Sequence, residues 1–152
     1  MVENKFFEDY VTGDLVVSDR FAITEEAVAN YCALVGDDHK IHTDREFCRE
    51  QIGVPEVVVP GCLILAFADS RWAALVTPST PYSPHYGHDK VRYLNRLLSN
   101  ETVFCEFKLI EKRRHDSVYG MLTFEVYVKK DDGSPVLFNI DKVLVPFKTP
   151  EA

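Results

Sequence analysis

The chain has 152 residues, of which 46% are hydrophobic and 27% are charged. This length predicts one domain, residues 1–152, with a sizeable core, and the composition is that of a soluble globular protein rather than a disordered or fibrous one. The net charge of −7 and the pI of about 5.2 argue against nucleic acid as a partner.

The four cysteines show no C-x-x-C spacing, so they do not form a zinc or redox pattern. We expect reduced core thiols at Cys32, Cys48, Cys62 and Cys105. The first ten residues contain no apolar stretch of the kind found in signal peptides, and the longest apolar run, Cys62 to Val76, is too short to cross a bilayer. We therefore expect a cytoplasmic protein with no membrane partner.

The N-terminal part of the chain predicts a strand and two helices. Leu15 to Ile23 reads as a strand, and Thr24 as the N-cap of a helix that Gly36 ends. The 3.6-residue period predicts that one face of this helix is buried, formed by Ala27, Val28, Tyr31, Leu34 and Val35. Thr43 and Glu46 match a capping box for a short helix through about Glu50.

The remainder predicts one long helix and an antiparallel sheet. From Gly61 to Val76 the chain is apolar nearly all round, which is typical of a helix buried in the middle of a protein, and Thr77-Pro78 ends it. A loop is expected to about Gly87. Four strands follow, the last three joined by hairpin turns at 113–117 and 131–134: Lys90 to Tyr93, Thr102 to Lys112, Val118 to Lys129 and Val136 to Val145. This order predicts an α+β fold with the sheet wrapped around the long helix.

The densest chemistry lies in the segment G-D-D-H-K-I-H-T-D, residues 36–44. Asp37 and His42 sit in a short loop between the end of one helix and the start of the next. A carboxylate and an imidazole held near each other can polarise a water molecule and move a proton on and off carbon. The structural alternative is a helix-end aspartate and an ordinary loop histidine, because the spacing alone is a weak pattern.

Three stretches together resemble the MaoC-like family, which includes the (R)-specific enoyl-CoA hydratases and has the hot-dog fold. Asp37 and His42 match its catalytic positions, and V-V-V-P-G-C-L-I-L resembles the segment where a glycine starts the central helix. Gly61 takes that position, which implies that its backbone N–H serves as an oxyanion hole. The stretch Tyr86 to Tyr93 looks like the strand that opens the family's second half. The resemblance runs from about Phe7 to Val145.

The chain departs from the family's pattern at three places around this site. His39-Lys40 replaces a usual Asn-Pro, Pro60 replaces a usual histidine, and Ala66 replaces a serine of the central helix. The resemblance also implies that substrate-binding residues lie next to the oxyanion glycine and on the following strand, and we expect them to be Pro60, Cys62, Lys90 and Arg92, with Arg96 nearby.

The resemblance implies a hydratase/dehydratase (a lyase of fatty acid metabolism) that acts on 2-enoyl and 3-hydroxyacyl thioesters by Asp/His acid–base catalysis. The expected partner is an acyl-CoA or acyl-carrier-protein thioester. No separate cofactor is expected, because coenzyme A is part of the substrate. A homodimer or higher homo-oligomer is also implied. The alternatives are a hot-dog acyl-CoA thioesterase and a non-catalytic acyl-thioester-binding subunit.

Two further histidine-bearing segments have open interpretations. The basic turn Lys112-Arg113-Arg114-His115 could attract coenzyme A phosphates or could be an ordinary charged hairpin turn. His85 and His88 could line an acyl channel or belong to a surface loop. The five histidines show no paired spacing, so no metal site is expected.

Overall fold

The computed structural model describes residues 4–77 and 79–149 of the chain. Short elements occupy the N-terminal third, and long strands follow the long helix. In chain order the elements are η1 (Phe7–Asp9), β1 (Leu15–Val17), β2 (Phe21–Ala22), α1 (Glu25–Val35), α2 (Lys40–Thr43), α3 (Arg45–Phe47), η2 (Cys48–Ile52), α4 (Gly61–Leu75), β3 (His85–Tyr93), β4 (Thr102–Arg114), β5 (Tyr119–Lys130) and β6 (Pro135–Pro146).

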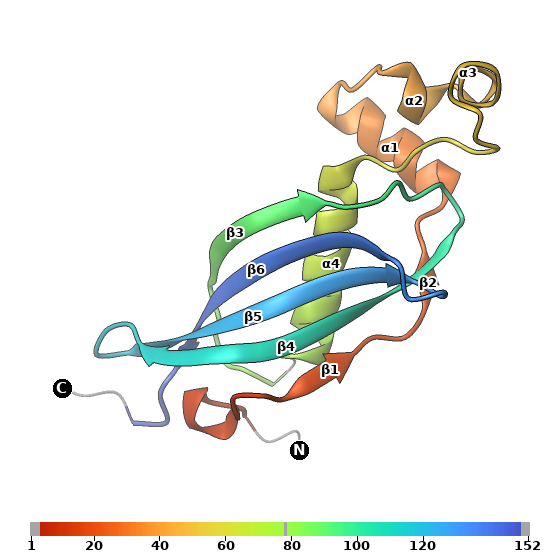
Figure 1. Cartoon of the computed structure of the whole chain (residues 1–152). Coiled ribbons are helices and arrows are strands. Elements are labelled where there is room, and N and C mark those ends of the chain that lie inside the picture. The colour runs from red at the N-terminus through yellow and green to blue at the C-terminus, as the bar shows by residue number, and fades with distance from the viewer. Residues whose placement is uncertain (1–3, 78, 150–152) are drawn as a thin grey trace.

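The strands form one antiparallel sheet in the order β1-β4-β5-β6-β3, with β2 also paired to β4 (Figure 1). Hairpin turns join β4 to β5 and β5 to β6, as the sequence predicts. The sheet curves across α4, so the α+β prediction and the arrangement of sheet and long helix are confirmed (Figure 1). Among the described residues, no helix is long and apolar enough to cross a membrane.

The core lies between the sheet and one face of α4. Alternate residues of β4 are buried, as the two-residue period of a strand requires, and Phe107 is among the largest of them. From α4 the buried side chains are Leu63, Ile64, Ala68 and Trp72. The Trp72 indole packs edge-on against Phe124 of β5 with ring centroids 6.0 Å apart, which fixes the helix on the sheet.

The prediction that α4 is buried all round is wrong for the single chain. Its outward face is exposed at Ala66, Ser70, Ala73 and Ala74. A sheet can cover only one side of a helix, and within residues 4–77 and 79–149 no second layer covers the other side (Figure 1). One cysteine prediction changes for the same reason, because Cys62 lies on the exposed side whereas the other three thiols are buried.

Two strand predictions differ from the structure. The first expected strand is divided, because Ser18 turns inward and its hydroxyl accepts a hydrogen bond from the Cys105 N–H at 2.8 Å. Strand β3 begins at His85, inside the segment expected to be a loop, and its pairing with β6 is interrupted by two register shifts. Pro78, expected at the end of α4, lies outside the described residues.

Helices α1 to α3 project beyond one end of the sheet (Figure 1). Thr24 caps α1 by accepting a hydrogen bond from the Ala27 N–H, and Gly36 ends the helix, as predicted. The predicted buried face is only partly correct, since Leu34 is 84% exposed and Val35 54% exposed. The last turn of α1 extends past the core, so periodic apolar residues there find nothing to pack against.

The cap of the next helix is Asp44 rather than Thr43. The Asp44 carboxylate accepts a hydrogen bond from the Phe47 N–H at 2.9 Å, whereas the Thr43 hydroxyl donates to the His39 carbonyl. We therefore expect Asp44→Ala to lower the free energy of unfolding by about 1 kcal/mol. Urea denaturation measures this, with Thr43→Ala as the matched variant. An equal or larger loss in Thr43→Ala would contradict the assignment.

Candidate functional site

Asp37 is held at the end of α1 by the local backbone. Gly36 takes the left-handed conformation, with φ of 74°, which a residue without a side chain adopts readily. This turn lets the Asp37 N–H donate to the Cys32 carbonyl at 2.9 Å. One Asp37 carboxylate oxygen then accepts from the His39 N–H at 3.1 Å. The second oxygen remains directed toward the loop side of α1.

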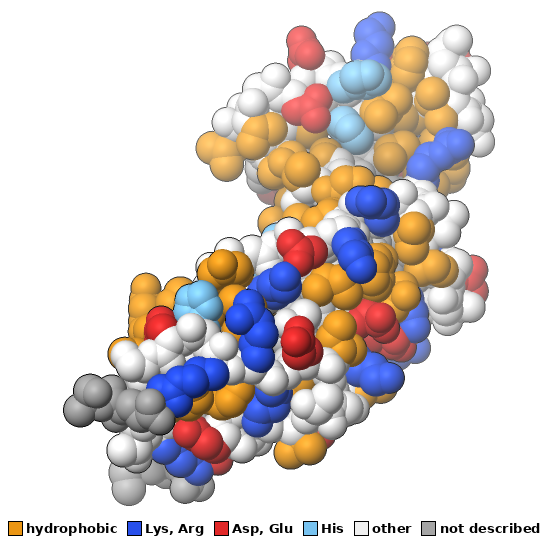
Figure 2. Space-filling model, turned by 60° about the vertical axis from the view of Figure 1, so that its left-hand side comes forward, with side chains coloured by type: hydrophobic (Ala, Val, Ile, Leu, Met, Phe, Trp, Pro, Cys, Tyr) orange, Lys and Arg blue, Asp and Glu red, His pale blue; other side chains and the backbone are white. Residues whose placement is uncertain are grey.

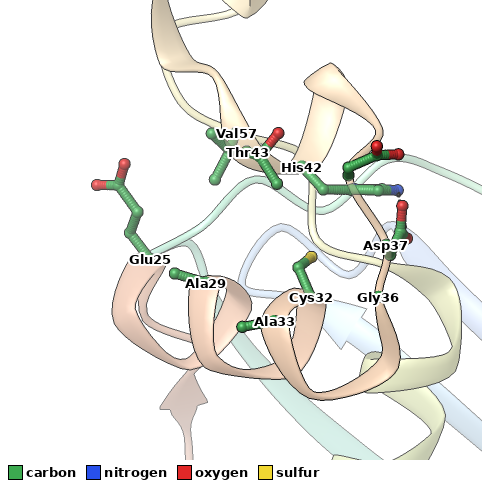
Figure 3. A pocket seen from close by; sticks show the side chains of 10 residues that line it. Glu25, Ala29, Cys32, Ala33, Gly36, Asp37, His42, Thr43 and Val57 are labelled. Atoms are coloured by element: carbon green, nitrogen blue, oxygen red, sulfur yellow. Dashed lines mark ion pairs between the residues drawn. The ribbon is translucent and has the colours of Figure 1, made fainter.

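His42, in the short helix α2, faces that second oxygen (Figure 3). Its Nε2 lies 4.0 Å from Asp37 Oδ2, too far for a direct hydrogen bond and close enough for one water to bridge the two groups. On the other side of the ring, Nδ1 lies 2.6 Å from the Val58 carbonyl oxygen. Because a carbonyl can only accept, Nδ1 carries a proton, so that in the neutral imidazole the lone pair is on Nε2, the nitrogen that faces Asp37.

His42 forms part of the wall of two neighbouring pockets. The first, about 420 Å³, is lined by Asp37 and by mainly apolar side chains of α1 and the following segment, among them Ala29, Cys32 and Val57. The second pocket, about 480 Å³, contains Gly61. Hydrophobic side chains surround the acidic and histidine side chains in this upper part of the molecule (Figure 2). A ligand that enters both pockets must pass His42.

Gly61 stands at the start of α4, where backbone donors are unpaired. Pro60 is buried, and its carbonyl accepts from the Leu63 and Ile64 N–H groups at 3.0 and 3.2 Å. The first N–H groups of a helix have no acceptor within the helix, and the helix dipole favours negative charge there. A Cβ on Gly61 would lie 2.7 Å from the Tyr93 ring, so a glycine is required for this close approach.

Tyr93 lines the candidate site, although the sequence did not predict it as a site residue. Its hydroxyl donates to the Cys62 thiol at 3.8 Å, and its ring lines the Gly61 pocket. Partial burial raises the pKa of Tyr93 to about 12, and the neighbouring Cys62 adds to the shift. The phenol therefore stays a neutral donor at physiological pH. No local pattern identifies it, since β3 and α4 are brought together only by the fold.

The four expected substrate-binding residues are not all placed together. Cys62 lines the pocket that contains Gly61 and His42, while Pro60 lies buried behind it. Among the described residues, Lys90 and Arg92 line neither of the two pockets that share His42. Arg96 does line the Gly61 pocket and is the nearest candidate for a phosphate or carbonyl contact.

The basic turn lies at the β4–β5 hairpin, at the opposite end of the sheet from helices α1 to α3 (Figure 1). Two of its side chains are used within the fold, since Lys112 donates to the Tyr10 carbonyl and Arg113 contacts the Met121 sulfur. This position favours the interpretation as a charged hairpin turn over a role at the Asp37–His42 site.

His85 and His88 occupy strand β3 instead of a surface loop. They meet Asp69 of α4 and Asp141 of β6, and the candidate ligand atoms of the four residues lie within 4.8 Å of one another. Spacing along the chain gave no sign of this cluster, because its members come from three elements up to 72 positions apart. Residues that meet in this way are invisible in the spacing of the histidines, on which the expectation of no metal site rests.

Comparison with known proteins gives a family and a fold. The model of the family described as MaoC like domain matches residues 9–129. The chain is 28% identical over 114 residues to protein MaoC of Klebsiella aerogenes, which covers 72% of this chain and 33% of that protein. The chain thus spans about a third of the length of this curated relative.

Three solved structures with the same fold belong to proteins that are described in different ways. A monoamine oxidase regulatory protein from Archaeoglobus has a TM-score of 0.85 and 24% identity, with 97% of each chain covered. The R-hydratase PhaJ1 from Pseudomonas aeruginosa has a TM-score of 0.76 and 18% identity, covering 98% of this chain and 92% of that one. A Mycobacterium tuberculosis protein with a double hot-dog fold has a TM-score of 0.82 and 15% identity, covering 100% and 47%. The fold is therefore the hot-dog fold.

Proposed function

Because the chain belongs to the family of MaoC-like domains, we propose that it hydrates 2-enoyl thioesters and dehydrates the corresponding 3-hydroxyacyl thioesters. The observation that carries this proposal is the position of His42. Its free Nε2 faces Asp37 on one side, and the pocket it shares with Gly61 opens on the other. The three groups that the reaction needs, an acid–base pair and a donor for a developing oxyanion, line two pockets that share His42.

The acid–base step follows from the tautomer of His42. With its Nδ1–H donated to the Val58 carbonyl, Nε2 takes a proton from a water that Asp37 also holds, while the water oxygen adds to Cβ. The pair then delivers one proton to Cα, so that H and OH from one water add across the double bond. Dehydration runs through the same groups in reverse.

The start of α4 supports the other half of the reaction. Addition to Cβ places negative charge on the thioester oxygen, and an unpaired N–H at Gly61 stabilises that charge together with the helix dipole. The Tyr93 ring occupies the space that a side chain at Gly61 would take, so the thioester reaches this N–H from the pocket that Gly61 shares with Cys62 and Arg96. The pocket beside Asp37 then receives the acyl chain against Ala29, Ala33 and Val57, while Glu25, Asp38 and Thr43 add polar side chains to its lining.

The thioester carrier is coenzyme A or an acyl carrier protein, approached from the Gly61 side near Arg96. We also propose a homodimer that covers the outward face of α4. A helix that exposes a row of small and apolar side chains beside its own core is typical of an interface. Light scattering should then give twice the 17.4 kDa mass of the chain.

Two assays on the same purified protein test the activity. With short and medium 2-enoyl-CoAs, loss of the enoyl absorbance without release of free thiol is the expected result. Thiol release without hydration would indicate a thioesterase, and tight binding with neither change would indicate a non-catalytic acyl-thioester binder. Either of these two outcomes contradicts the proposed function.

Cys62 gives an independent test of where the thioester lies. It is the exposed one of the four thiols and lines the Gly61 pocket, so we expect N-ethylmaleimide to reach it through that pocket even in a dimer that covers the outward face of α4, and to leave the buried three unmodified. Butyryl-CoA, which cannot be hydrated, should slow this modification in proportion to occupancy of the site. Mass spectrometry of the peptides measures both effects. Unchanged labelling of Cys62 at saturating butyryl-CoA would place the thioester elsewhere.

A further inference from the structure

A second cluster of polar side chains lies between α4 and the edge of the sheet, apart from the Asp37–His42 site. It joins Asp69 of α4, His85 and His88 of β3, and Asp141 of β6. Asp69 follows Gly61 by eight positions, about 12 Å along the helix. We propose that these four residues bind a divalent transition metal ion of the Zn²⁺ type, which ties the long helix to the edge strand.

A bulge in β3 brings the two histidines to the same side of the strand. Residues three apart in a regular strand point to opposite faces. Here the pairing with β6 shifts by one residue between His85 and Gly87, so that both imidazoles face α4 with ring centroids 4.4 Å apart. Gly87 has φ of 151°, a conformation that residues with side chains rarely adopt. The local geometry of the strand thus serves to place two nitrogen ligands together.

Asp141 supplies a preformed carboxylate at the centre of the cluster. It pairs directly with His88 across the strands, and its side chain is 3% exposed. One carboxylate oxygen lies 2.5 Å from His85 Nε2 and 3.5 Å from His88 Nδ1. A charge buried to this degree is costly unless positive groups surround it, and a divalent cation is the strongest such group.

Asn139, two residues before Asp141 on the same strand, is positioned to orient His88. Its side-chain nitrogen lies 2.6 Å from His88 Nδ1, while its own oxygen is buried and has no hydrogen-bond partner. A half-turn of the amide puts that oxygen against a protonated Nδ1, and the amide NH2 then takes the buried position that the oxygen holds now. His88 Nε2, which faces Asp69 at 3.2 Å, then carries a lone pair for a metal.

The outer side of the cluster gives an ion access. The side chains of Asp69 and His85 are each 40% exposed, whereas Asp141 closes the inner side. A tetrahedral ion with bonds of about 2.0–2.2 Å needs ligand atoms a little over 3 Å apart, so small rotations from the present spacing of up to 4.8 Å suffice. Two carboxylates also balance the charge of a divalent ion.

The ligand types decide which metal is expected. Two imidazoles with two carboxylates suit Zn²⁺ and its first-row neighbours, whereas Mg²⁺ and Ca²⁺ prefer oxygen ligands alone. A closed set of four protein ligands is typical of structural zinc and leaves no position for a substrate. The expected effect of the metal is therefore on stability, independent of the hydration reaction.

Titration of untagged, chelator-treated full-length protein with Zn²⁺ tests the proposal. We expect about one ion bound per chain by calorimetry, a rise in Tm of about 5–10 °C at saturation, and visible absorption from four-coordinate Co²⁺ in place of Zn²⁺. His85→Ala and Asp69→Asn, both at half-exposed positions, should weaken Zn²⁺ binding at least about tenfold.

His115→Ala is the matched control, since it removes an exposed histidine that is outside the cluster and packs against Tyr86, the neighbour of His85. It should bind Zn²⁺ as the unaltered chain does. The proposal is overturned if the unaltered chain binds no Zn²⁺, if both cluster variants bind it equally well, or if His115→Ala loses it to the same degree. In those cases the four residues are ion pairs of the fold alone.

Discussion

Asp37→Asn and His42→Ala are each expected to lower kcat/KM for 2-enoyl-CoA hydration by about 10²–10⁴-fold. Asparagine keeps the shape of the side chain and its hydrogen bond with the His39 N–H but lacks the negative charge that holds the water and stabilises a protonated His42. Alanine at position 42 removes Nε2, the lone pair that faces Asp37 at 4.0 Å. Initial rates from the loss of enoyl absorbance measure both effects.

The fold should survive both changes, because Asp37 and His42 lie in the helical part that projects from the sheet and neither is in the core. Circular dichroism and urea midpoints close to those of the unaltered chain would confirm this. His39→Ala is the matched control, since this histidine neighbours the pair, with its ring centroid 6.1 Å from that of His42, and lines neither pocket. Near-normal turnover in Asp37→Asn would contradict the assignment of Asp37 and His42 as the acid–base pair.

The largest expected effect on stability is that of Phe107→Ala, about 3–5 kcal/mol in the free energy of unfolding. The Phe107 side chain is 1% exposed and lies on the concave face of β4, within the core between the sheet and α4. Its removal loses the burial of an aromatic ring and leaves a cavity. Because domains of this size are stable by about 5–15 kcal/mol, this is a large fraction of the total.

Phe104, three positions earlier in the same strand, provides the control. Its side chain lies on the opposite face, half-buried under the Arg20 guanidinium at 5.3 Å. Phe104→Ala is expected to cost about 1 kcal/mol. Guanidinium chloride denaturation at one fixed protein concentration measures both, which keeps any effect of dimerisation equal. Similar losses in the two variants would contradict the division of β4 into a core face and an outer face.

Long elements with a clear period were predictable from sequence. Strand β6 alternates buried and half-buried residues along most of its length, β4 has every second residue buried from Val103 to Leu109, and turn residues mark both hairpins. Strand β3 was predicted too short because His85 to Asp89 contains a bulge, which disrupts the alternation. The exposure of the outward face of α4 could not be predicted, because small side chains are equally typical of a buried helix face. The sequence does not indicate which element, if any, covers that face.

The parts of the site that are close in sequence could be predicted, whereas the parts that come from distant segments could not. Asp37 and His42 are five positions apart, in a loop fixed by a glycine and a helix start, so sequence could suggest the pair. The Val58 carbonyl that sets the His42 tautomer, and the Tyr93 ring against Gly61, come from segments that meet only in three dimensions. For the same reason, the sequence did not indicate that Asp69 and Asp141 lie beside His85 and His88.

The two irregularities of β3 also bear on how this protein behaves in a crowded solution. An edge strand with evenly spaced, unpaired backbone groups invites strands of other chains to add to it, which leads to aggregates. In β3 the register shifts fall between His85 and Gly87 and between Asp89 and Arg92, and Lys90, inside the second shift, adopts a φ of 55°. A foreign strand would find only short runs of matching donors and acceptors, so the same bends that gather the histidines also discourage unselective sheet growth.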